Sequence, residues 1–62
     1  MKSYFDNGQI IFWFALIAMV EIGDDSLAVY FTGCTNTAYL YECNGDMQLF
    51  LADYREWLKI CS

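Results

Sequence analysis

The sequence contains no histidine, and this absence removes the base that acyl-transfer triads and many other nucleophilic sites require. The adjacent carboxylates, Asp24 and Asp25, fall in an expected turn and lack the spacing of a calcium loop. Gly23, Gly33 and Gly45 belong to separate turns and cannot form one phosphate-binding loop. We therefore predict a protein that is not an enzyme and carries no cofactor.

Cysteine is present but without a metal-binding pattern. The three cysteines form no CxxC pair, and no histidine completes a zinc set, so we expect no metal site. Cys43 falls in an expected strand and Cys61 on the apolar face of an expected helix, so both are predicted to be buried small hydrophobes. A disulfide remains the alternative. Unpaired thiols favour a reducing cytoplasm.

Basic residues are scarce. Lys2, Arg55 and Lys59 stand against eight acids, which gives a net charge of −5. Three scattered basic groups cannot form the positive stripe that phosphates require, so direct nucleic-acid binding is not expected. Acidity favours a protein partner with a basic surface, through electrostatic attraction. The alternative is that it serves only to keep an apolar chain soluble.

Long hydrophobic runs are limited to residues 10–20, which carry no charge. A membrane-spanning helix needs about 20 apolar residues, so this run is too short. It also lacks the basic flank and cleavage site of a signal peptide. We expect no membrane association. Hydrophobic residues nevertheless make up 58% of the chain, more than so short a chain can bury.

Turn residues divide the chain, whose length allows a single domain over 1–62 with strands within 2–43. Side chains that alternate between two faces predict a strand at 26–32, and the same spacing with aromatic residues predicts one at 37–43. Residues 18–22 are expected to form a third strand, joined to these as an antiparallel meander. The uninterrupted hydrophobicity of 9–17 fits a strand or a short buried helix. Its β-branched and aromatic residues favour a strand paired with 2–5. The turns lie at 6–8, 23–25, 33–36 and 44–45.

Residues 46–60 give the strongest pattern, that of an amphipathic helix capped by Asp46. Asp46 at its start and Lys59 near its end also suit the helix dipole. The predicted fold class is therefore α+β, a small antiparallel sheet of three to four strands with one C-terminal helix packed on one face. The expected apolar face of the helix consists of Met47, Phe50, Leu51, Tyr54, Trp57, Leu58 and Cys61.

A single helix covers one face of the sheet, so the other face is left for a partner. We expect Tyr39 and Tyr41 to share the covered face with Leu27, Val29 and Phe31, or to form an interface themselves. In the first case the free face carries Ala28, Tyr30 and Leu40. The predicted partner-binding residues are Asp24, Asp25, Tyr30, Leu40, Glu42 and Asp46.

In size, acidity and lack of catalytic groups the chain resembles small phage-borne inhibitor proteins, including anti-CRISPR proteins. The resemblance is one of composition and involves no specific motif. It implies an acidic protein-binding inhibitor or adaptor that blocks a basic surface of a larger host protein. The alternative is a structural or regulatory homo-oligomer that uses its apolar N-terminal segment as the interface. In that case Phe12, Trp13 and Phe14 would contribute to self-association.

Overall fold

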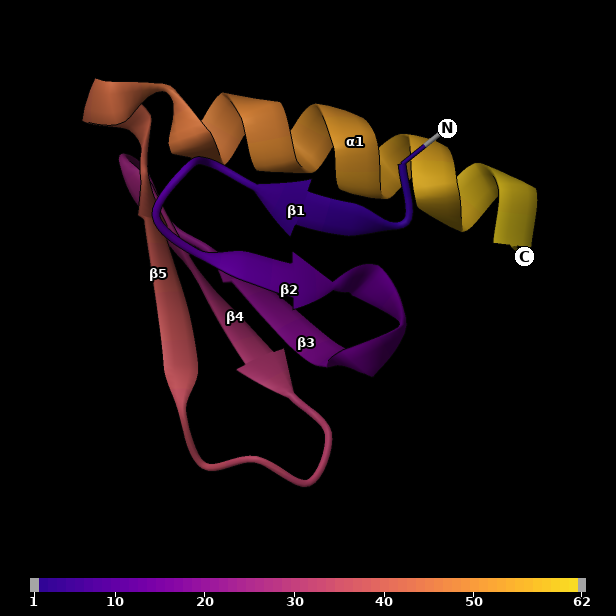
Figure 1. The fold of residues 1–62 in the computed structure, drawn as a ribbon. Helices are drawn as coiled ribbons and strands as arrows, with labels where there is room; N and C mark the ends of the chain where they lie inside the picture. Colours follow the sequence, from indigo (N-terminus) through magenta and orange to yellow (C-terminus); the bar gives the residue numbers. More distant parts are fainter. Residues whose placement is uncertain (1, 62) are drawn as a thin grey trace.

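The computed structural model describes residues 2–61, which form an α+β fold, as predicted (Figure 1). Its main sheet has three antiparallel strands in sequential order, β3 (Ile17–Ile22), β4 (Ser26–Phe31) and β5 (Thr37–Tyr41). The turns between them fall where glycine, aspartate and asparagine gather in the sequence. The expected meander is therefore confirmed, although its last strand ends at Tyr41 and not at residue 43.

The apolar N-terminal run does not form one continuous element. β1 (Tyr4–Asp6) and β2 (Ile11–Trp13) pair as the predicted hairpin, in a separate two-stranded sheet. A single 3-10 turn, η1 (Phe14–Leu16), then leads into β3. The backbone N–H of Phe14 donates to the carbonyl of Ser3 at 3.0 Å. The chain therefore turns at Phe14, whose ring enters the core.

The helix α1 (Asp46–Cys61) matches the prediction, but its start differs in detail. The 3-10 turn η2 (Glu42–Asn44) precedes it and ends at Gly45, whose φ of 83° lies in the left-handed region that glycine adopts without strain. The Asn44 side chain accepts a hydrogen bond from the Asp46 N–H at 3.1 Å. Asp46 is therefore the first residue of the helix, and the predicted cap at Asp46 is wrong.

The Asp46 side chain instead fixes the hairpin to the helix. One of its carboxylate oxygens accepts a hydrogen bond of 2.7 Å from the Asn7 side-chain amide. Asn7 lies in the turn between β1 and β2 and also accepts hydrogen bonds from the N–H groups of Gln9 and Ile10. A polar contact thus joins residues far apart in sequence beside the core.

The core lies between the main sheet and a layer made by α1 and the hairpin (Figure 1). Phe50 is fully buried and its ring lies within 6.0 Å of those of Phe5 and Phe14, centroid to centroid. Aromatic rings at these separations attract one another, and this attraction stabilises the core in addition to the burial of apolar area. The buried apolar side chains are Phe5, Phe14, Leu27, Ala28, Val29, Leu40, Met47 and Phe50.

The apolar face of α1 is buried only at its beginning. Leu51, Tyr54 and Trp57 are half-buried, while Leu58 and Cys61 are exposed, contrary to the prediction for the last two. The C-terminal turns of α1 extend beyond the strands, so no sheet surface lies beneath them (Figure 1). The apolar spacing therefore predicts the helix over its whole length, but the sheet is too short to cover the apolar face of the last turns.

The outer edge of β5 has no partner strand among residues 2–61. The Glu42 N–H donates to the Asp25 carbonyl at 2.9 Å, so Asp25 and Glu42 form a hydrogen-bonded pair at the end of the β4–β5 ladder. Because bonded and non-bonded pairs alternate in antiparallel sheets, Ala38 and Leu40 exchange backbone hydrogen bonds with β4. The N–H and C=O groups of Thr37, Tyr39 and Tyr41 therefore point away from the sheet.

Candidate functional site

The main sheet has one covered and one open face. Val29 and Leu40 point to the covered face, toward α1 and the hairpin. Successive side chains alternate, so the open face, called here the outer face, carries the other set. The strand register arranges this set in three rows. The rows are Met19, Tyr30 and Thr37; Glu21, Ala28 and Tyr39; and Gly23, Ser26 and Tyr41.

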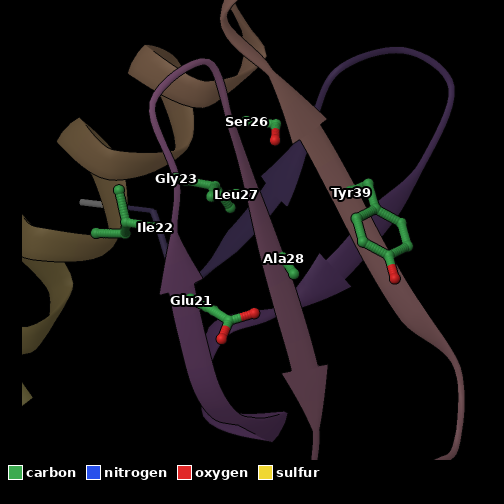
Figure 2. Close-up of a pocket in the computed structure, with 7 residues that line it drawn as sticks. All are labelled: Glu21, Ile22, Gly23, Ser26, Leu27, Ala28 and Tyr39. Atoms are coloured by element: carbon green, nitrogen blue, oxygen red, sulfur yellow. The ribbon is translucent and has the colours of Figure 1, made fainter.

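The outer face is hollow in its middle. Gly23, Ser26 and Ala28 are small, whereas Glu21 and Tyr39 stand on either side of Ala28, one on β3 and the other on β5 (Figure 2). The resulting depression, called here the outer trough, has a volume of about 380 Å3. Its lining residues are Glu21, Ile22, Gly23, Ser26, Leu27, Ala28 and Tyr39.

A carboxylate and a phenol are coupled at one end of the outer trough. The Tyr30 hydroxyl donates a hydrogen bond of 3.3 Å to Glu21 Oε1. The negative charge of Glu21 raises the pKa of Tyr30 above its ordinary value, with smaller contributions from desolvation, this hydrogen bond and Tyr39. Glu21 is thus held on the outer face, where its charge acts on its neighbours.

Negative charge gathers at one end of the main sheet. Asp24 and Asp25 occupy the turn between β3 and β4, and Glu42 is joined to that turn by the backbone hydrogen bond to Asp25. All three side chains are exposed. Residues 26–41 carry no charge, so the opposite end of the sheet is neutral. We call Asp24, Asp25 and Glu42 the acidic end.

The structure divides the remaining predicted contacts between surface and interior. Tyr30 lies on the outer face, as expected, but Leu40 is buried at 1% exposure opposite Leu27. The reason is the register, because a shift of one residue exchanges the two faces of a strand. Tyr39 and Tyr41 are therefore exposed in its place, at 58% and 48%. Asp46 is half-buried and holds Asn7, away from the outer face.

The three residues predicted for self-association also differ in exposure. Phe14 is buried and Phe12 is half-buried, with its ring centroid 5.1 Å from that of Phe31. Only Trp13 is exposed, at 56%, because side chains alternate along β2. Ile11 shares its face and was missed by the sequence analysis. The alternation could not be read from the sequence because every residue of this strand is apolar.

The cysteines lie at the surface. Cys34, Cys43 and Cys61 are all exposed free thiols, so the predicted burial of Cys43 and Cys61 is wrong. Cys43 falls in the η2 turn after β5, and Cys61 lies at the overhanging end of α1. Within residues 2–61, no three side chains of the types that bind metals come together.

None of the helical segments in the described part of the chain is long and apolar enough to span a membrane. No protein-family model matches the chain, and no curated protein sequence or solved structure gives a significant match.

Proposed function

We propose that the protein is a small acidic protein-binding inhibitor or adaptor that covers a basic surface of a larger protein. The observation that carries this proposal is the distribution of charge on the main sheet, where the acidic end adjoins an aromatic outer face whose one charged side chain is Glu21. Protein interfaces combine a poorly charged aromatic centre with a polar rim. Tyr39 and Tyr41 would form the centre, and the acidic end would form part of the rim.

The two parts of this surface would contribute differently to binding. Rim charges mainly accelerate encounter with a partner of opposite charge. Exposed tyrosines supply rigid apolar area with a polar tip, and such residues provide a large share of interface affinity. The compositional resemblance to phage-borne inhibitors extends the proposal to a host protein as target, and the exposed thiols favour the cytoplasm as the site of action.

Charge reversal at the acidic end tests this proposal. Asp24→Lys with Asp25→Lys changes the net charge from −5 to −1, since each substitution adds two charges. Both residues are exposed in a turn, so the free energy of unfolding should change by less than about 0.5 kcal/mol. With the partner isolated from a host lysate by pull-down, the association rate should fall for this variant. It should also fall with salt, because attraction is screened over about 10 Å at 0.1 M.

The matched control is Asp53→Lys with Glu56→Lys, which makes the same change in net charge on α1, away from the outer face. Its association rate should stay closer to that of the wild type if the position of the charge matters. Association rates insensitive both to salt and to reversal at the acidic end would refute the proposal.

A homo-oligomer is the second candidate, and one observation favours it. Ile11 and Trp13 project from the same face of β2 and are 66% and 56% exposed. Adjacent exposed apolar side chains of this kind can form part of an interface, and in a homo-oligomer the same patch serves both copies. Sedimentation equilibrium at micromolar concentration should then show a dimer or larger species, and Trp13→Glu should shift it to the monomer. A wild-type monomer across that range would eliminate this candidate.

A further inference from the structure

We propose that the outer trough binds one arginine side chain of the partner, an inference that rests on the proposed function and specifies its chemistry. The outer trough offers three things that an arginine side chain needs: a carboxylate, an aromatic wall and an apolar floor. They come from Glu21, Tyr39 and Ala28, which the register places in one row across three strands. Figure 2 shows the Glu21 carboxylate and the Tyr39 ring on opposite sides of Ala28.

The width of this row suits a guanidinium group. Neighbouring strands lie about 4.8 Å apart, so the backbones of β3 and β5 are separated by about 10 Å. In Figure 2 the Glu21 carboxylate points toward Ala28 from β3, and the Tyr39 ring lies over β5 on the other side of Ala28. A flat group entering between them can stack on the ring and hydrogen-bond to the carboxylate.

The surroundings favour a cation over an anion. Lys2, Arg55 and Lys59 are absent from the lining of the outer trough. The acidic end begins at Asp24, the residue after Gly23 in the lining, so negative charge extends beyond the trough. An anionic ligand would meet repulsion at Glu21 and again at this end.

Arginine fits better than lysine. The guanidinium is planar, forms two parallel hydrogen bonds with a carboxylate and stacks on aromatic rings, whereas an ammonium is compact and strongly hydrated. The methylene groups of the arginine can rest on Ala28, whose side chain forms the apolar floor of the outer trough. Each carboxylate oxygen can accept two hydrogen bonds, so the one that Glu21 Oε1 accepts from Tyr30 still leaves acceptor sites for both guanidinium bonds.

Short peptides test this inference without the natural partner. Wild-type protein labelled with ¹⁵N is titrated with acetyl-Gly-Arg-Gly-amide, and amide shifts are followed by NMR. We expect saturable shifts centred on Glu21, Ala28 and Tyr39. The matched peptides contain lysine or citrulline, an uncharged isostere of arginine. The citrulline peptide should produce no saturable shift, and the lysine peptide should bind at least about fivefold more weakly.

Two variants distinguish binding in the outer trough from attraction by the overall negative charge of the protein. Ala28→Leu fills the floor and should abolish saturation by the arginine peptide, while Asp24→Lys should leave the shifts at Ala28 and Tyr39 in place. If Ala28→Leu does not fold, as judged from its own NMR spectrum, Glu21→Gln replaces it and should weaken binding about fivefold.

The inference is overturned if the arginine peptide gives no saturable shift. It is also overturned if lysine binds as well as arginine, or if the trough-blocking variant binds like the wild type. These results are distinguishable from failure of the proposed function, because the peptide titration requires no partner. The arginine peptide could bind in the outer trough while the rate of association with the partner is unchanged by charge reversal at the acidic end. That pair of results would support the arginine site and refute the proposed function.

Discussion

Phe50→Ala should destabilise the protein by about 3 to 5 kcal/mol, which is enough to unfold most of a domain this small. Phe50 is 0% exposed and its ring lies 5.1 to 6.0 Å, centroid to centroid, from those of Phe5, Phe12, Phe14 and Tyr54. Removing the ring leaves a cavity lined by β1, β2, η1 and α1, and a cavity that its surroundings only partly refill adds to the cost. Thermal and urea unfolding followed by circular dichroism would measure the loss.

The neighbouring residue provides the control. Leu49 lies in the same turn of α1 but is 42% exposed, so Leu49→Ala should cost less than about 1 kcal/mol. Trp57→Ala should fall between the two, because Trp57 is half-buried where α1 extends beyond the strands. Equal losses for Leu49→Ala and Phe50→Ala would mean that α1 does not pack by the observed face.

Leu40→Ala should cost about 2 to 5 kcal/mol, because Leu40 fills the core opposite Leu27. Tyr39→Ala, one residue earlier on β5, removes a larger side chain from the outer face and should cost less than about 1 kcal/mol. Chemical denaturation of both variants measures the difference. The reverse order, with Tyr39→Ala the more damaging, would place the tyrosines in the core and contradict the register.

The helix and the main strands could be predicted because their signals are periodic and independent of one another. The helical spacing from Met47 to Trp57 and the alternation along β4 each require only local sequence. The pairing of β4 with β5 is different, since an alternating pattern results whether Leu40 or its two neighbours face the core. Leu40 and its neighbours Tyr39 and Tyr41 are all apolar enough to be buried, and hydrophobicity alone does not choose between them.

The candidate site was only partly predictable for the same reason. Asp24 and Asp25 could be placed at the surface because charged residues in turns remain solvated, whereas Glu42 was expected at the end of the strand 37–43 and lies in the η2 turn. Glu21 was missed, because its place beside Ala28 and Tyr39 depends on the pairing of three strands. The turn at Phe14 was also invisible, since it interrupts a run of apolar residues without glycine, proline or charge.

The free edge of β5 should give neighbouring peptide groups different rates of hydrogen exchange. In deuterated water, the amide hydrogens of Thr37, Tyr39 and Tyr41 face the solvent and should be replaced quickly. Those of Ala38 and Leu40 bond to β4 and are released only when the sheet opens. Isotope uptake along β5 should therefore alternate between fast and slow from one residue to the next.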